Sequence, residues 1–366
     1  MEIINATIQK EFIKPINKLH QLSPYVGKIR PELATYLIKN YCSVNGTIWD
    51  PFCGSGTIPL EAWINGHSVF ASDLNLYAYI LTLGKLNPPA TLDNAIEKLK
   101  KYNKIVINQA FKFDKDTLPI WLFDFFHPQT LIELYIWTKL LHQKEEWFLL
   151  SCLLGILHHQ RPGFLSYPCS HGAPYLRSNK YSKELFPEMY EYRNVFVRLE
   201  KKVTRTLAGG AKFDFNLNRE VFLQNAHSSL IDKPRVNTII TSPPYMKALT
   251  YARDNRLRLW FLGVENWKEL DKTVSPCKSD FKDLMKDSFS TWSKHQILGD
   301  KCILIIGDML IQRTPSITLS EYVTMIAEAN NYKLIRLFQD PIPEARKIVK
   351  GNNRIKSEHI CIFEKL

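Results

Sequence analysis

The sequence predicts an α/β fold in which a seven-stranded, Rossmann-like sheet is interrupted by a largely helical insertion. Short apolar runs alternate with helical patterns in the first ninety residues, which is typical of a parallel, doubly wound sheet. From about residue 91 to 211 there is no convincing β alternation, and the strand and helix patterns resume afterwards. The 366 residues are 45% hydrophobic, which is enough to bury a core and excludes a disordered chain.

Residues 1–90 supply the first units of the sheet. Apolar runs predict two strands, and segments with helical spacing predict three helices around them. In chain order we expect helix 31–40, strand 47–50, helix 57–65, strand 68–73 and helix 74–85. Pro31 suits a first helical turn, Gly66 is placed to end the second helix, and the two prolines after Asn87 must end the third.

Residues 91–214 form the predicted insertion. Apolar residues at helical spacing predict helices over residues 91–106, 128–142, 146–159 and 188–207. Between residues 160 and 187 the chain is rich in Pro, Gly, Ser, Tyr and His, which is typical of a loop.

Residues 215–366 return to alternating strands and helices. We expect strands over residues 220–226, 236–241, 301–307, 332–339 and 358–363, and helices over 280–296 and 320–330. With the two earlier strands these make seven, and we expect them to form one sheet.

Composition limits the partners and the location. Lys and Arg total 48 against 36 Asp and Glu, and a net charge of +12 favours a polyanionic partner. No stretch approaches the roughly 18 apolar residues of a membrane span, and the first thirty residues lack a signal-peptide pattern. We therefore expect a cytoplasmic protein with no membrane partner. His158, His159, Cys169 and His171 lie close together but lack regular zinc-ligand spacing, so we expect no metal.

A first motif, residues 50–57 (DPFCGSGT), lies where the first predicted strand ends and its helix begins. Doubly wound sheets bind nucleotides at this place. Gly54 and Gly56 would let a ligand approach the backbone, and Asp73, at the end of the next strand, would hold a ribose. A tight turn and a helix N-cap explain these residues without a ligand. Because neither a third glycine nor a Gly-Lys-Ser/Thr follows, a ligand with a ribose but no phosphates, such as S-adenosylmethionine, fits better.

A second motif, residues 241–245 (TSPPY), follows the apolar run 236–240 and so lies at the carboxyl end of another strand. Two prolines make a rigid backbone of carbonyl acceptors, Ser242 adds a side-chain acceptor, and Tyr245 offers a flat stacking surface. Together they suit an exocyclic amine on a planar base. The alternative is a proline-stiffened loop with a packed tyrosine, but both motifs at the ends of neighbouring strands favour a binding site.

The two motifs together resemble those of the S-adenosylmethionine-dependent amino-methyltransferases of DNA, the N4-cytosine and N6-adenine group. The Ser-Pro-Pro-Tyr form is most similar to that of the N4-cytosine enzymes. The similarity covers about residues 20–90 and 215–366. It implies a methyltransferase sheet built from residues 1–90, with the cofactor motif, and 215–366, with TSPPY. Residues 91–214 would be the insertion and a candidate target-recognition region.

The resemblance also implies roles for individual residues. The expected catalytic residues, which would hold the target amine, are Ser242, Pro243, Pro244 and Tyr245. The expected cofactor-binding residues are Lys28, Asp50, Pro51, Phe52, Gly54, Ser55, Gly56, Thr57, Asp73, Leu74, Asn225 and Thr241. Asn225 stands where the family often has an acidic residue.

Basic residues are candidate DNA contacts, although each cluster by itself is more often a solvated surface than a ligand site. The expected set is Arg161, Arg177, Lys180, Arg198, Lys202, Arg205, Arg253, Arg346, Lys350 and Arg354. Arg198, Lys202 and Arg205 form a stripe at helical spacing. The loop from residue 160 to 183 mixes donors with aromatic side chains, and we expect it to read bases.

The predicted function is direct methyl transfer from S-adenosylmethionine to the N4 amine of a flipped cytosine in double-stranded DNA. By resemblance the enzyme would serve a restriction-modification system, with a cognate restriction endonuclease as a further partner. The alternatives are an adenine-N6 DNA methyltransferase, a guanine-N2 RNA methyltransferase and a non-catalytic nucleic-acid-binding module. A carbon-5 cytosine enzyme would need a Pro-Cys thiolate, and neither Pro168-Cys169 nor Pro276-Cys277 follows a recognisable strand.

Overall fold

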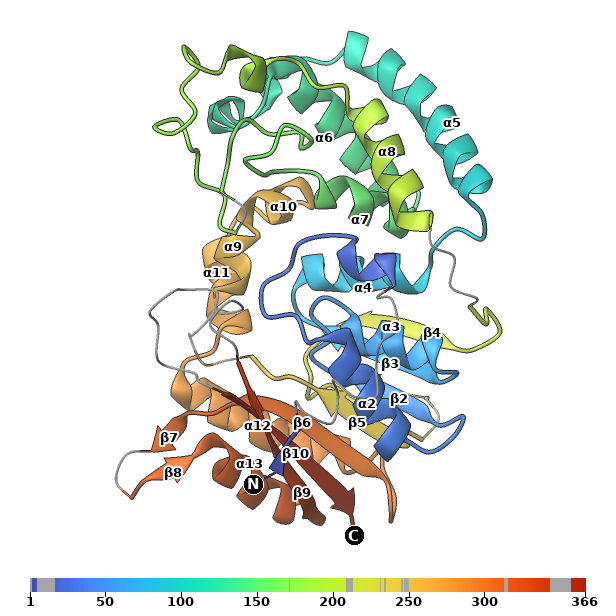
Figure 1. The fold of residues 1–366 in the computed structure, drawn as a ribbon, viewed down its shortest axis with the longest axis vertical. Coiled ribbons are helices and arrows are strands. Elements are labelled where there is room, and N and C mark those ends of the chain that lie inside the picture. The colour runs from blue at the N-terminus through green and yellow to red at the C-terminus, as the bar shows by residue number, and fades with distance from the viewer. Residues whose placement is uncertain are drawn as a thin grey trace.

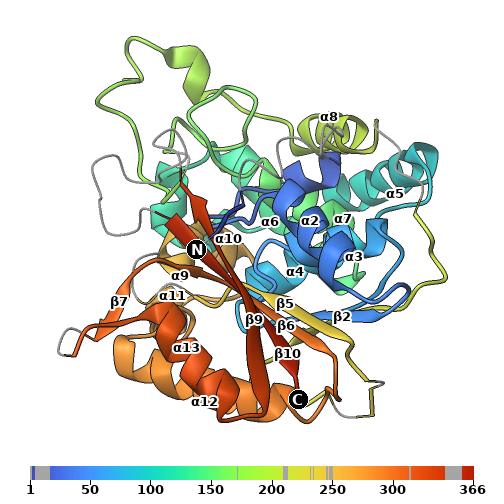
Figure 2. The same cartoon turned by 60° about the horizontal axis from the view of Figure 1, so that its bottom comes forward.

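The computed structural model describes residues 2–4, 17–170, 172–208, 213–230, 232–233, 235–244, 246, 250–312, 315–342 and 357–366. A group of helices lies at the top of Figure 1 and a twisted sheet with flanking helices lies below it. The same division is visible from the second direction in Figure 2.

Eight strands of the described chain form one mixed sheet in the order β1-β9-β10-β6-β5-β2-β3-β4. They are β1 (Glu2–Ile3), β2 (Thr47–Asp50), β3 (Ser68–Asp73), β4 (Arg219–Leu223), β5 (Thr238–Thr241), β6 (Lys301–Gly307), β9 (Tyr332–Pro341) and β10 (Ser357–Lys365). β10 is antiparallel to β6 and β9, and the other pairs are parallel. The predicted α/β fold with a Rossmann-like sheet is confirmed, and β1 is an eighth strand that the sequence did not predict. β7 (Leu310–Gln312) and β8 (Ile317–Thr318) pair separately.

Helices cover both faces of the sheet. The side chains of a strand point alternately to the two faces, and here both sets are apolar, so both faces must be buried. Ile48 and Val69 pack with the core under α2 (Pro31–Tyr41), α3 (Thr57–Ile64) and α4 (Leu76–Leu86). Their neighbours Trp49 and Phe70 face the opposite core, under α12 (Lys278–Trp292) and α13 (Leu319–Glu328). The strands are therefore buried on both sides, as their continuous apolar runs predict.

The helical region contains α5 (Leu92–Phe111), α6 (Pro128–Gln143), α7 (Trp147–Gly155) and α8 (Val195–Leu207), with 3-10 turns η2 (Lys115–Thr117), η3 (Ile120–Asp124) and η4 (Pro187–Tyr190). α7 packs on α4. A Cβ on Gly84 of α4 would lie 2.4 Å from Ser151 Oγ, so the glycine permits this close approach. The predicted helix from residue 188 starts at Val195 instead, because Asn194 caps it by accepting a hydrogen bond from the Val197 N–H.

Besides the 3-10 turns η2 and η3, four short helical segments of the described chain were absent from the sequence-based prediction. They are η1 (Lys18–Gln21), α9 (Tyr251–Asp254), α10 (Arg256–Phe261) and α11 (Trp267–Val274). α10 contacts both α4 and α6, and η1 contacts α8. These short segments therefore connect the helical region to the sheet.

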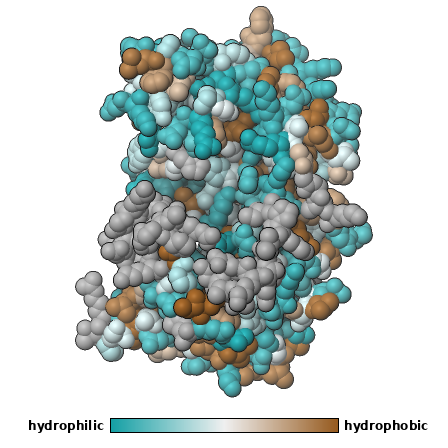
Figure 3. All heavy atoms as spheres, viewed as in Figure 1, coloured by the Kyte–Doolittle hydropathy of each residue, from teal (hydrophilic) through white to brown (hydrophobic). Residues whose placement is uncertain are grey.

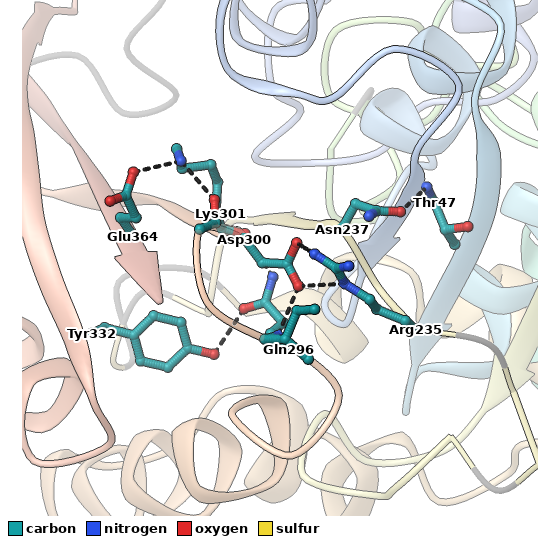
Figure 4. A network of polar contacts seen from close by, with 10 residues as sticks. Thr47, Arg235, Asn237, Gln296, Asp300, Lys301, Tyr332 and Glu364 are labelled. Atoms are coloured by element: carbon teal, nitrogen blue, oxygen red, sulfur yellow. Dashed lines mark hydrogen bonds and ion pairs between the residues drawn. The ribbon is translucent and has the colours of Figure 1, made fainter. Parts of the chain in front are cut away.

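A polar network braces the amino ends of the central strands, shown in Figure 4. Asp300 pairs with the Arg235 guanidinium through both carboxylate oxygens and also accepts the Ile297 N–H at 2.8 Å. The Asn237 side chain accepts the Thr47 N–H at 2.9 Å, which ties β5 to β2. These contacts join the segments that enter β2, β5 and β6 at this end of the sheet.

The described residues contain no helix that is long and apolar enough to cross a membrane. On the face of the molecule in Figure 3, the surface is mainly hydrophilic, with scattered hydrophobic side chains over the upper, helical region. Exposed apolar residues of that region include Phe111, Ile120 and Leu185.

Candidate active site

The carboxyl ends of β2 and β5 form the topological switch point of the sheet. The two strands are parallel neighbours, with Ile48 opposite Thr238. From β2 the sheet continues to β3 and β4 on one side, and from β5 to β6 on the other. Open α/β sheets bind ligands in the crevice at such a point. A cavity of about 580 Å³ is found here, lined by residues of both sequence motifs.

The glycine-bearing loop after β2 has a conformation that depends on its glycines. Gly54 has φ +48° and Gly56 has φ +68°, both in the left-handed region. A Cβ on Gly56 would lie 2.7 Å from Thr82 Oγ1 and 3.1 Å from its Cα, so α4 leaves no room for a side chain. The Gly54 N–H donates to Asp73 Oδ2 at 2.9 Å, which joins the loop to the end of β3.

Asp50 connects the two motifs. Thr241 donates its hydroxyl to Asp50 Oδ1 at 2.7 Å, and the Phe52 N–H donates to Thr241 Oγ1 at 3.1 Å. Asp50 is 2% exposed, and burial raises its pKa to about 8 against the lowering effect of the Thr241 and Phe52 hydrogen bonds. A buried carboxylate of this kind can gain from a positively charged ligand.

The cavity has an acidic lining. Burial also raises the pKa of Asp73 to about 6, partly offset by hydrogen bonds from the backbone N–H groups of Asn75, Gly54 and Leu74. The described lining residues include five carboxylates and one lysine: Asp50, Asp73, Asp280, Asp283, Asp287 and Lys272. This charge balance suits a cationic ligand, although the whole protein is strongly basic.

Nine of the twelve expected cofactor-binding residues line the cavity. They are Asp50, Pro51, Phe52, Gly54, Ser55, Thr57, Asp73, Leu74 and Asn225. Gly56 and Thr241 are not lining residues. Gly56 packs against Thr82, and Thr241 donates its hydroxyl to Asp50, so both support residues that line the cavity. Lys28 lies elsewhere: its ammonium donates to the carbonyls of His20 and Ser23, at 3.2 and 2.7 Å, beside a second cavity.

Two of the four expected catalytic residues line the same cavity as the glycine loop. Ser242 and Pro244 line it, and Pro243 is buried between them. Tyr245 lies outside the described residues. Pro276 is also a lining residue, but the neighbouring Cys277 stands at the start of α12 and not after a strand.

Several lining residues were not identified from the sequence. Tyr25 and Tyr251 have ring centroids 6.2 Å apart and lie between the two motifs. Asp280, Asp283 and Asp287 recur at helical spacing on α12, a signal that could have been read as one acidic helix face. Tyr25 follows no strand and had no such signal.

The basic residues expected to contact DNA are spread over several environments. Arg161, Arg177 and Lys180 are exposed on the loop of the helical region, and Arg253 is exposed on α9. Arg198 donates to the Pro162 carbonyl at 2.7 Å. Lys202 is only 6% exposed, so the expected stripe on α8 is not a continuous surface. Arg346, Lys350 and Arg354 lie outside the described residues.

The cysteine and histidine cluster offers no obvious reactive group. Burial raises the pKa of Cys169 to about 12, which is opposite to an activated thiolate. Within the described chain, which omits His171, no three side chains gather as metal ligands.

Part of the chain matches a known family. Residues 23–120 match the model of the RMKL-like methyltransferase domain, and this segment contains β2, the glycine loop and Asp73. The match supports an S-adenosylmethionine-dependent methyltransferase, with S-adenosylmethionine as its cofactor. The buried carboxylates of the cavity are chemically compatible with the cationic sulfonium and ammonium groups of this cofactor.

One similar curated protein is the type II methyltransferase M.MjaII of Methanocaldococcus jannaschii, which is 31% identical to this chain over 108 residues. This covers 30% of the present chain and only 19% of the relative's length. The solved structure of TrmN from Thermus thermophilus is 12% identical, with a TM-score of 0.36. The match covers 97% of the present chain and 55% of the other. An S-adenosylmethionine-dependent methyltransferase from Methanosarcina mazei is 11% identical, with a TM-score of 0.37. The match covers 90% of the present chain and 97% of the other. These structural similarities are low, and the fold assignment depends on the strand order instead.

Proposed function

We propose that this protein transfers the methyl group of S-adenosylmethionine to the exocyclic N4 amine of cytosine in double-stranded DNA. The observation that carries the proposal is the shared cavity, because Ser242 and Pro244 line the same cavity as Gly54 and Asp73. The domain match over residues 23–120 and the similarity to a type II methyltransferase support methyl transfer. The Ser-Pro-Pro-Tyr motif supports the cytosine amine as the acceptor.

The cofactor would lie along the end of β2. Asp50, with the loop from Pro51 to Thr57, would border its methionine part, and Asp73 its ribose. Binding a cation would lower the pKa of the buried Asp50 carboxyl, because an opposite charge favours the ionised form. Asn225, which follows β4, would lie near the adenine.

The second motif would orient the acceptor amine. S-adenosylmethionine, when bound, supplies an electrophilic methyl carbon on its sulfonium sulfur. The Ser242 hydroxyl and the Pro243 carbonyl would accept the amine hydrogens, which directs the nitrogen lone pair towards that carbon. The amine nitrogen would take the methyl group, the N–C bond forming as the S–C bond breaks, and one amine proton would pass to water. Tyr245 would stack on the flipped base.

The remaining parts of the chain would serve target binding. In this proposal residues 1–90 and 215–366 form the catalytic unit, and residues 91–214 the target-recognition region. The exposed Arg161, Arg177 and Lys180 would contact bases or phosphates. The enzyme would work in a restriction-modification system with a cognate endonuclease, in the cytoplasm.

The test is to incubate the protein with S-adenosylmethionine and genomic DNA, digest the DNA to nucleosides and identify them by mass. N4-methylcytosine is expected. N6-methyladenine would overturn the choice of base, and N2-methylguanosine from a parallel incubation with RNA would overturn the choice of nucleic acid. Pro243→Ala should abolish transfer while cofactor affinity, measured by calorimetry, stays within about twofold of wild type, since Pro243 is not a lining residue of the cofactor's wall.

A further inference from the structure

A second cavity, of about 420 Å³, lies beside the first one and shares Tyr25 with it. Its walls come from three parts of the chain: the segment that follows η1, the helical region with α8, and the segment of α9 and α10. In Figure 1 the dark-blue segment containing η1 runs between α8 and α4, and η1 contacts α8. The cavity therefore lies where the helical region meets the sheet.

Four basic side chains line this second cavity: Lys28, Lys202, Arg205 and Arg258. Arg258 is 1% exposed and Lys202 is 6% exposed, whereas Arg205 is exposed. In the described part of the chain none of the four forms an ion pair with a carboxylate. Asp254, the acidic residue of this wall, already accepts from the Thr250 hydroxyl and the Arg253 guanidinium.

Arg258 has a buried donor without a partner. Its Nε donates to the Leu154 carbonyl and its Nη1 to Asn255 Oδ1, both at 3.1 Å, but buried Nη2 has no hydrogen-bond acceptor among the described residues. Leaving such a donor unsatisfied costs about 1–3 kcal/mol. An anion that reaches Nη2 would remove this cost.

The two lysines have donors to spare. An ammonium has three N–H groups. Lys202 uses one on the Gln21 carbonyl at 2.7 Å, and Lys28 uses two on the carbonyls of His20 and Ser23. Loss of water around the Lys28 ammonium, then the like charges of Lys202 and Arg258, lower its pKa to about 8, although the rest of the side chain is exposed. The site thus concentrates positive charge that the protein itself does not neutralise.

We propose that this cavity binds one phosphate of the nucleic-acid substrate, beside the nucleotide whose base enters the first cavity. This inference rests on the proposed function. A phosphodiester offers only acceptors and a negative charge, which match free donors and unpaired cations. A base that is flipped about its backbone stays within one nucleotide of its own phosphates, and the two cavities share Tyr25 as a lining residue. Such a phosphate contact sets the position of the substrate without reading sequence.

The experiment compares Arg205→Gln, Lys28→Gln and the double variant with Lys201→Gln as control. Lys201 is exposed on the same helix and does not line the cavity. We measure affinity for a DNA duplex by fluorescence anisotropy from about 50 to 200 mM salt. Each single variant should weaken binding about fivefold to tenfold, and the slope of log K against log salt should fall by about one. In the double variant the slope should also fall by only about one, because both side chains contact the same phosphate. The affinity and slope of Lys201→Gln should match those of wild type.

Three results would overturn the inference. The first is unchanged duplex affinity and salt slope in the double variant. The second combines two measurements. Calorimetry without DNA would show that wild type binds inorganic phosphate more tightly than the variants do, while wild type and variants bind the duplex with the same affinity. This would identify a free-anion site. The third is that Lys28→Gln weakens S-adenosylmethionine binding but not duplex binding, which would assign the cavity to the cofactor carboxylate.

The failure of this inference can be distinguished from failure of the proposed function. If no methylated DNA nucleoside forms but duplex binding still depends on Arg205 and Lys28, the proposed function alone is wrong. If methylation proceeds and duplex binding does not depend on them, the phosphate site alone is wrong. A further variant, Arg258→Lys, keeps the charge but removes the forked donor, so it should weaken duplex binding while the salt slope stays at the wild-type value.

Discussion

At the residue scale, Asp50 is the group whose chemistry depends most on its surroundings. Its carboxyl is buried at the junction of the two motifs, with a pKa raised to about 8. Between its ordinary pKa of 3.8 and this value, the folded protein keeps a proton that the unfolded chain releases. Without a ligand, stability therefore falls as pH rises through this window. A cationic ligand reverses the effect by binding the ionised carboxylate.

This predicts a pH dependence of cofactor affinity. Affinity for S-adenosylmethionine should rise several-fold from pH 6 to pH 9, because Asp50 must lose its proton to face the cation. Asp50→Asn should flatten this rise and leave only a smaller dependence near pH 6 from Asp73. Calorimetry in two buffers of different ionisation enthalpy should detect proton release on binding at pH 7 for wild type. No release would contradict the role of Asp50.

Gly56 gives a second prediction at this scale. Gly56→Ala places a Cβ against the backbone and side chain of Thr82 in a left-handed conformation, so both strain and overlap oppose it. The substitution should destabilise the protein by about 2–4 kcal/mol and weaken cofactor binding. In Gly54→Ala the Cβ would lie 3.4 Å from the Tyr25 ring and 3.9 Å from the Phe52 carbonyl oxygen, both ordinary contacts, so we expect a smaller loss of stability. Urea unfolding and calorimetry check both, and equal losses would contradict this explanation.

At the scale of elements, the sequence predicted correctly those strands and helices whose formation depends on neighbouring residues in the chain. The strand 47–50 and the helix from Thr57 agree with β2 and α3 because an apolar run and a glycine turn define them. The helices α9, α10 and α11 were missed because they are short and polar residues interrupt them. α10 is stabilised by contacts with α4 and α6, which no local pattern encodes. Tyr25 and Arg258 enter the two cavities for the same reason, through tertiary packing.

The network at the amino ends of the strands provides a prediction at this scale. Asp300→Ala removes the paired contact with Arg235 and the acceptor for the Ile297 N–H. Because Arg235 is partly exposed, we expect a moderate loss of stability, about 2 kcal/mol, seen as a lower urea midpoint. Cofactor affinity should stay at the wild-type value, since the cavity lies at the opposite ends of the strands. A large drop in affinity would show that the two ends are coupled.

At the scale of the whole molecule, charge is divided between two neighbouring cavities. The chain carries a net charge of +12, yet the first cavity is lined by five carboxylates among its described residues. An acidic cavity attracts a cationic cofactor and repels phosphates, whereas the second cavity is basic. A nucleic-acid backbone would therefore pass along the helical region and the second cavity, and only an uncharged base would enter the first.

The exposed loop of the helical region leads to the last prediction. Arg177 is exposed in this loop, close in sequence to Tyr175 and Tyr181, and its backbone N–H donates to the Pro168 carbonyl at 2.9 Å. An anchored backbone with an exposed guanidinium is suited to base contacts. If Arg177 reads a base, Arg177→Gln should cost about 1–3 kcal/mol on the preferred site and relax the preference at one base pair. Lys101→Gln, a control on the exposed side of α5, should change neither. Sequencing the methylated positions in DNA treated with each variant measures the preference directly. If Arg177 instead contacts a phosphate, binding should weaken equally on all sequences and the methylated positions should stay the same.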